Sequence, residues 1–203
     1  MHRNVLVATL LVALAIATVS CSRPSPPAGT PPDAQSSQAL NTQQPDANTP
    51  GDIPDNQAFV AFTAQDHSFT VDVPEGWART NSGDGATFSD TFNSMAITSR
   101  TGTAAPTPEG ARLTELAEIA VANPSVSNGD VSTVTRPAGQ AVLLTYRQES
   151  AVNPVTGKST ALAVERYEFF RNGQTVALTL AGPIGADNVD PWRHITDSFR
   201  WAP

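Results

Sequence analysis

The chain contains a single cysteine, Cys21, which directly follows an apolar run from Val5 to Val19 and the small residue Ser20. One cysteine cannot form a disulfide within the chain. Any domain that follows must therefore be stabilised by its own hydrophobic core, and it needs enough residues to bury one.

The first twenty residues have the pattern of an export signal. A weakly basic start precedes the apolar run, and a small residue stands at the expected cut. The run is shorter than the roughly 20 apolar residues of a transmembrane helix. We therefore expect residues 1–20 to be a signal peptide that is removed.

The tetrad Thr18-Val19-Ser20-Cys21 resembles a bacterial lipobox. In that motif the cysteine is linked to diacylglycerol and becomes the new N-terminus, and two acyl chains hold a protein stably on a membrane. The resemblance implies that Cys21 is lipidated and that the protein lies on the extracytoplasmic side of the cell membrane. A plain secretory signal that leaves Cys21 as a free thiol is the alternative.

Residues 21–56 are expected to be the lipidated cysteine and a disordered, proline-rich linker. Eight prolines fall in this stretch, and the rest is mostly Ser, Thr, Gln, Asn, Ala, Asp and Gly. Such a composition buries too little apolar surface to offset the entropy of ordering. As a flexible coil, the linker would span about 30 to 35 Å and lift a domain off the lipid.

Residues 57–203 have the length of one globular domain. This region has ten Lys and Arg residues against fifteen Asp and Glu residues, so it is mildly acidic. It carries no basic stripe, which argues against a nucleic-acid partner and against electrostatic docking to anionic lipid.

Apolar and polar residues alternate in several short segments, which predicts strands. These segments are 69–73, 86–92, 95–100, 131–135, 140–150, 162–171 and 174–181. Asn172-Gly173 separates the last two and predicts a tight hairpin.

Two helices are expected. The first begins after an N-cap at Thr107, has Pro108 at its first position and ends before Pro124. Its apolar residues at helical spacing are Leu113, Leu116, Ala117 and Ala120. The second helix places Val189, Trp192, Ile195 and Phe199 on one face, with Asp190 as its N-cap. Together these elements predict an α+β domain with an antiparallel sheet.

Three fragments resemble the Mog1/PsbP-like superfamily, and in particular its actinobacterial LpqN-type lipoproteins. They are Phe69-x-Val71-x-Val73-Pro74-x-Gly76-Trp77, the hairpin from Arg166 to Pro183, and Trp192-Arg193-x-Ile195-x-Asp197-Ser198-Phe199-Arg200-Trp201. The resemblance implies a central antiparallel sheet flanked by helices, an α/β/α sandwich. Members of the superfamily are mostly adaptor or assembly proteins, and the resemblance supplies no catalytic residue set.

Candidate chemistry is sparse. Asp190, His194 and Asp197 could face one side of the last helix and hold a metal, but an exposed polar face is the favoured interpretation. Asp66-His67 is interpreted as part of a loop or the start of a strand, because adjacent strand residues point to opposite faces. The residues Ser89, Ser94, Ser99 and Ser198 lack a Gly-x-Ser-x-Gly context, and Arg166, Glu168 and Arg171 are expected on a solvated strand face. We expect no metal and no cofactor.

Tryptophan is enriched in interface hot spots, so Trp201 is the expected partner contact if it is exposed.

The favoured function is a membrane-anchored cell-envelope lipoprotein, not an enzyme, with an adaptor or binding domain. Its partners would be the membrane, through Cys21, and either an envelope protein or a small apolar ligand. A small-ligand or lipid carrier is the second hypothesis, and an envelope hydrolase is the third.

Overall fold

The computed structural model describes residues 49–83, 85–102 and 104–203. The expected signal peptide, Cys21 and the linker up to residue 48 lie outside this part of the chain. Within the described residues, no helix has the length and apolar character needed to cross a membrane.

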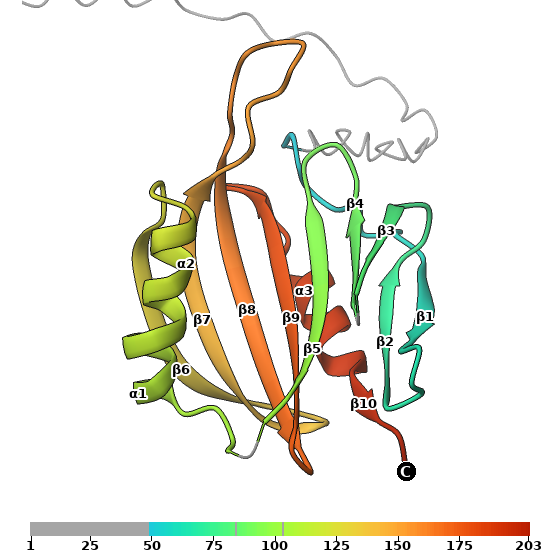
Figure 1. Ribbon diagram of the computed structural model, residues 1–203. Coiled ribbons are helices and arrows are strands. Elements are labelled where there is room, and N and C mark those ends of the chain that lie inside the picture. Colours follow the sequence, from blue (N-terminus) through green and yellow to red (C-terminus); the bar gives the residue numbers. More distant parts are fainter. Residues whose placement is uncertain (1–48, 84, 103) are drawn as a thin grey trace, which may run out of the picture. The chain divides into compact units, whose positions relative to one another are not determined.

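All but one of the alternating segments lie in a seven-stranded antiparallel sheet (Figure 1). In spatial order its strands are β3 (Ala78–Ser82), β4 (Gly85–Ser89), β5 (Ser94–Thr101), β9 (Gln174–Pro183), β8 (Ala161–Arg171), β7 (Gly139–Glu149) and β6 (Ser127–Arg136). Six of the seven coincide with predicted segments. β3 was missed because all five of its residues are exposed and show no apolar alternation.

A second sheet has three strands, with β2 (Phe69–Pro74) between β1 (Phe59–Thr63) and β10 (Arg200–Trp201). The sequence predicted one sheet. The structure has two because the turn after Pro74 carries the chain from β2 into β3 of the larger sheet. Gly76 adopts φ 84° in this turn, a conformation that glycine accepts most readily.

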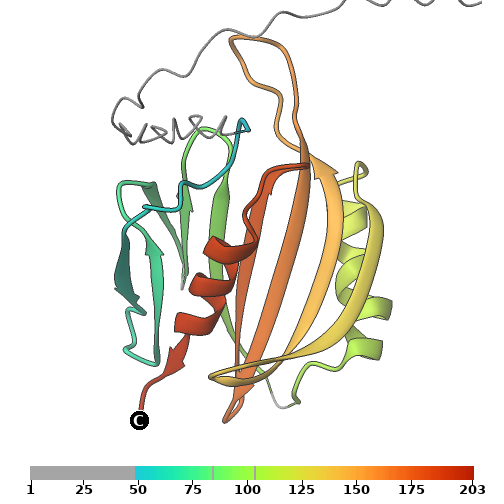
Figure 2. The same ribbon diagram turned by 180° about the vertical axis from the view of Figure 1, so that it is seen from behind.

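Helices cover opposite faces of the larger sheet (Figures 1 and 2). One face is covered by α1 (Pro108–Gly110), a π-helical turn η1 (Ala111–Glu115) and α2 (Leu116–Ala122), which together form one helical segment. The other face packs against α3 (Val189–Ser198) and the smaller sheet. The predicted α+β class and the flanking helices are confirmed.

The first helical segment begins as predicted and then deviates. Thr107 is the N-cap, and its Oγ1 accepts a hydrogen bond from Gly110 N–H at 3.1 Å. The π-helical turn adds a residue, since Leu116 N–H bonds to the carbonyl of Ala111. This rotates the apolar stripe, so the predicted core residue Leu113 is 68% exposed.

The last helix buries three of its four predicted apolar residues: Trp192, Ile195 and Phe199. Val189 is exposed instead. The predicted N-cap at Asp190 is wrong, because the helix begins two residues earlier, at Val189, and its N-cap is Asn188. The Asn188 side chain makes no capping hydrogen bond and binds other segments of the domain.

The folded chain begins upstream of Gln57, the first residue of the domain in the sequence analysis. Ile53 is buried in the main core, and Gly51 is buried against Pro183. Asn188 holds this segment, because its Oδ1 accepts from Ile53 N–H at 2.8 Å and its Nδ2 donates to the carbonyl of Gly51 at 3.1 Å.

Phe199 lies at the centre of the aromatic core between the two sheets. Its ring stacks on Phe169 with centroids 4.4 Å apart and packs against Phe69 at 5.5 Å. Trp201 meets it edge-on at 5.1 Å and is only half-buried. Phe199 therefore joins α3 to both sheets.

We expect Phe199→Ala to lower the free energy of unfolding by about 3 to 5 kcal/mol, because it empties a fully buried aromatic site. The matched control is Phe92→Ala, the same change at a side chain that is 45% exposed, which should cost less than about 1 kcal/mol. Urea denaturation measures both. Equal losses would contradict the central position of Phe199.

Candidate functional site

Two arginines and two glutamates meet where the helical segment covers the sheet. Arg166 Nη2 donates to Oε1 of Glu115 at 2.8 Å and to Oε1 of Glu168 at 3.1 Å. Arg100 Nη2 lies 3.5 Å from Oε1 of Glu168 and 3.7 Å from Oε2 of Glu115. The Glu168 side chain is completely buried, whereas that of Arg100 is 56% exposed, so the cluster meets solvent at Arg100.

Strand register and the π-helical turn assemble this cluster. Glu168 lies between Val142 on β7 and Ala177 on β9, in the interior of the sheet. The π-helical turn ends at Glu115, and such turns are frequent at functional sites. The predicted solvated face for Arg166 and Glu168 is wrong, because the helical segment covers it.

The two carboxyl groups have opposite pKa shifts. Burial raises the pKa of Glu168 to about 7, with a further contribution from the hydrogen bond and charge of Glu115, while Arg166 opposes the shift. Burial also raises the pKa of Glu115. There the hydrogen bond from Glu168 and the positive charge of Arg166 outweigh burial, so the net pKa is lowered.

The pair can therefore share one proton near neutral pH. Oε2 of Glu168 has no hydrogen-bond partner among the described residues, which fits a carboxyl group that is readily neutral. The Glu168 side chain is fully buried, and the cluster reaches solvent through Arg100. We interpret the cluster as the electrostatic link between helix and sheet.

A polar concavity of about 540 Å³ lies beside α3 and β2. His194 Nε2 is 3.2 Å from Oδ2 of Asp72, and the imidazole packs on Phe59 with centroids 4.2 Å apart. Ser198 Oγ donates to the carbonyl of Ile195 at 2.7 Å and accepts from the backbone N–H of Asp72 at 2.8 Å.

Ser198, His194 and Asp72 are the residue types of a nucleophilic triad. The serine proton is directed at a helix carbonyl and not at the imidazole, so this geometry does not activate the hydroxyl. Asp190 and Asp197 line the same concavity. Across the described residues, however, no three His, Cys, Asp or Glu side chains are arranged to hold a metal ion.

Asp66 and His67 occupy a turn before β2. The Asp66 carboxylate accepts from the hydroxyl of Ser68 at 2.7 Å and from its backbone N–H at 3.0 Å, and these bonds lower the pKa of Asp66. His67 adopts φ 58° in this turn. The pair therefore forms a local turn structure, as the sequence analysis favoured.

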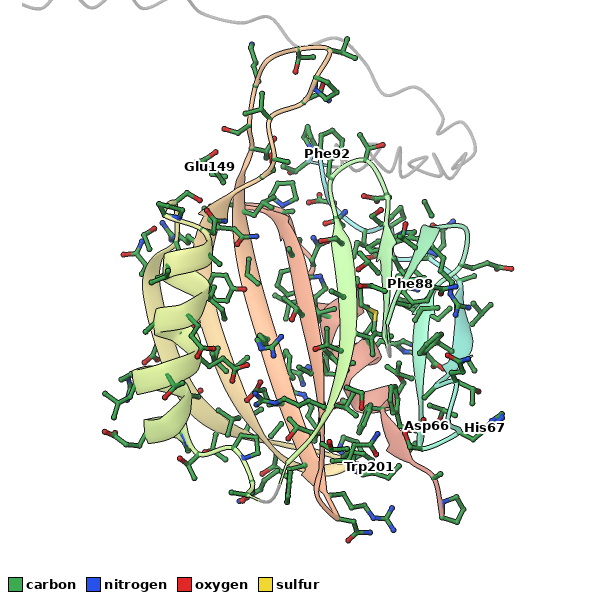
Figure 3. All side chains as sticks on the ribbon, in the orientation of Figure 1. Asp66, His67, Phe88, Phe92, Glu149 and Trp201 are labelled. Carbon is green, nitrogen blue, oxygen red and sulfur yellow. The ribbon has the colours of Figure 1, made fainter. Side chains whose placement is uncertain are left out.

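A groove of about 1000 Å³ lies between two connections, which are the β4–β5 turn (90–93) and the β7–β8 loop (150–160). Asn123, after α2, and Leu162, in β8, also line it. Figure 3 shows Phe92 and Glu149 at this end of the domain, and Asp66, His67 and Trp201 at the opposite end. The role of Trp201 as a partner contact remains a prediction.

The sequence analysis did not identify this groove. One signal was present: the β7–β8 connection is longer than the usual two to five residues of a hairpin loop. Long ordered loops frequently carry function. The β4–β5 turn gave no such signal, since residues 86–92 were predicted to be one strand.

We expect the free energy of unfolding to fall as the pH rises from 4.5 to about 7. The folded state keeps a proton on Glu168 that the unfolded chain releases near its ordinary pKa, and the slope approaches at most about 1.4 kcal/mol per pH unit. Glu168→Gln mimics the protonated group and should remove this slope. Urea denaturation across this range measures it.

The control is Glu118→Gln, on the exposed side of α2, which should leave the slope unchanged. Because the pKa of Glu115 is lowered, this residue affects stability only at pH values below this range. There the stability that the ionised Glu115 contributes is lost as the pH falls. A wild-type stability that rises between these pH values would contradict the prediction.

No protein-family model and no curated protein sequence matches the chain. Three similar solved structures are informative to compare. PsbP of the cyanobacterium Synechocystis sp. PCC 6803 (CyanoP) is 10% identical, with a TM-score of 0.52, and the match covers 75% of this chain and 98% of CyanoP. LpqN of Mycobacterium tuberculosis, a protein involved in cell envelope biogenesis, is 15% identical, with 73% and 92% coverage and a TM-score of 0.44.

A protein from Bacteroides thetaiotaomicron is 14% identical, with a TM-score of 0.48. The match covers 70% of this chain but only 48% of that protein, so this chain spans about half of its length. The likeness to CyanoP concerns the fold alone at this level of identity. The described domain therefore has a PsbP-like fold, and the fold that the three sequence fragments implied is confirmed.

Proposed function

We propose that this chain is a cell-envelope lipoprotein, held by Cys21 on the extracytoplasmic side of the cell membrane. Its PsbP-like domain acts as a non-catalytic adaptor that binds an envelope protein. The observation that carries the binding role is the groove of about 1000 Å³ between the β4–β5 turn and the β7–β8 loop. It is large enough for a peptide segment or a surface loop of a partner.

The groove is built on fixed backbone. Ser150 N–H donates to the carbonyl of Thr160 at 2.8 Å, and Asn153 N–H donates to that of Lys158 at 2.9 Å, which closes the β7–β8 loop as a hairpin. Asn93, in the β4–β5 turn, is buried and accepts from Asn188 Nδ2 at 2.9 Å. A binding surface that is already ordered loses little entropy when a partner docks.

The ionisable side chains support binding over catalysis. Glu168 has a strongly perturbed pKa but is completely buried. Ser198 is near His194, but its proton is engaged by the carbonyl of Ile195. The groove itself is lined mainly by amides, hydroxyls and small apolar groups, which suit recognition by hydrogen bonds and shape.

The anchor is tested by intact-mass and detergent-partition analysis of the protein purified from membranes. We expect a mature chain that begins at Cys21, carries diacylglycerol and enters the detergent phase. Cys21→Ala should carry no lipid, whereas the matched neighbour Ser22→Ala should keep it. A mature chain with a free thiol at Cys21 would show that the anchor is absent.

The adaptor role is tested by photo-crosslinking in intact cells. A crosslinking amino acid is placed in the groove at Thr91 or Thr156, and at exposed Thr101, outside the groove, as the control. We expect one dominant protein adduct from the two groove positions, little from Thr101, and less when Cys21 is replaced by alanine.

Other outcomes would replace this proposal. Apolar material that co-purifies with the chain in native mass spectrometry, without any protein adduct, would favour a small-ligand or lipid carrier. Ester hydrolysis by the purified chain that is lost in Ser198→Ala would favour a hydrolase.

A further inference from the structure

Exposed apolar side chains are concentrated at the end of the domain where the chain enters it. Among the described residues, eight large apolar side chains are exposed, and six of them belong to segments at this end. The six are Phe92, Val121, Val152, Val155, Ile184 and Val189. The other two are Val60, on β1, and Leu113, in the π-helical turn.

The β7–β8 loop carries two of these residues and projects beyond the ends of its strands (Figures 1 and 2). Val155 is 91% exposed, and Val152 is 64% exposed. Asn153 Oδ1 accepts from the backbone N–H groups of Val155 at 2.9 Å and Thr156 at 3.0 Å, so the turn is held in shape. The most exposed apolar side chain of the described domain therefore lies in a fixed, projecting loop.

Phe92 occupies the other side of the groove. Asp90 Oδ1 accepts from the backbone N–H groups of Phe92 at 2.7 Å and Asn93 at 2.6 Å. This carboxylate fixes the turn and leaves the Phe92 ring 45% exposed. The two loops thus present apolar side chains on opposite rims of one groove.

The attachment of the N-terminal segment lies at the same end. Asn188 fixes Gly51 and Ile53 to the domain, and Asp52 Oδ1 accepts from Asp187 N–H at 2.8 Å. The 27 residues from 22 to 48 connect Cys21 to this attachment. β8 has eleven residues and a length of about 36 Å, so the opposite end of the domain is farther from this attachment by about that distance.

The charges at this end do not attract an anionic surface. Among the groove-lining and adjoining residues that the structure describes, the four carboxylates of Asp52, Asp90, Glu149 and Asp187 outnumber the two cations, Lys158 and Arg147. Contact with a bilayer would therefore depend on apolar side chains that enter the interface between headgroups and acyl chains. The contact should not require anionic lipid.

We propose that Phe92, Val152 and Val155 contact the lipid surface of the membrane that holds the protein, so that the groove lies at that surface. This inference rests on the lipid anchor of the proposed function. The anchor already keeps the domain next to the bilayer, so the loop tips meet lipid at a high effective concentration. A few apolar side chains then suffice, although they would not hold an unanchored domain.

The test uses the full lipidated chain in phosphatidylcholine vesicles, with a single added cysteine at Val155, Phe92 or Leu113. Because Cys21 is the only native cysteine, lipidation leaves the added thiol as the one reactive site. Each thiol carries an environment-sensitive fluorophore, and brominated lipids quench it on contact. We expect Val155→Cys and Phe92→Cys to be quenched several-fold more than Leu113→Cys, the matched exposed apolar control on the flank of the domain.

Three results would overturn the lipid contact, and they separate its failure from that of the anchor. Equal quenching at all positions in chains that float with the vesicles would refute the contact and leave the anchor intact. Chains that stay in solution, with Cys21 itself labelled, would refute the anchor as well. Labels at Val155 and Phe92 that are shielded in native membranes but unquenched in pure lipid would assign the loop tips to a protein partner.

Discussion

The buried side chain of Asn188 determines how the groove end of the domain is assembled. Its amide binds the segment that enters the domain, through Ile53 and Gly51, and it also binds Asn93 in the β4–β5 turn. Gly182 makes room for this arrangement, since a Cβ there would lie 2.5 Å from Asn93 Oδ1 and 2.7 Å from Asn188 Nδ2. One buried side chain therefore fixes the segment at Gly51 and Ile53 relative to the β4–β5 turn, because an unpaired buried amide is costly.

Most of the fold could be predicted because its signals are local. The alternation along β8 and β9 and the Asn172-Gly173 turn predict their hairpin, and Thr107 predicts the start of the first helix. The π-helical turn could not be predicted, since no residue type marks one, and it exposes Leu113. The division into two sheets also depends on pairings between distant segments that periodicity does not report.

The candidate sites were harder to predict because they depend on contacts between distant residues. Arg166 and Glu168 alternate like solvated strand residues, and only the covering helix, through Glu115, converts them into a buried ion cluster. The sequence analysis read the start of α3 as a helix cap, and thus missed that Asn188 joins three segments. The long β7–β8 loop was visible in the sequence, but its partner across the groove was not.

The ion cluster and the buried amide contacts at the groove end differ in how they depend on pH. The ion cluster contains Glu168, whose pKa is raised to about 7, so the attachment of the helical segment to the sheet depends on protonation near neutral pH. The buried contacts at the groove end are amide–amide and amide–backbone hydrogen bonds of Asn188 and Asn93, and these groups do not titrate. The contacts that Asn188 makes with Ile53, Gly51 and Asn93 can thus persist over a pH range in which the helical segment changes its stability.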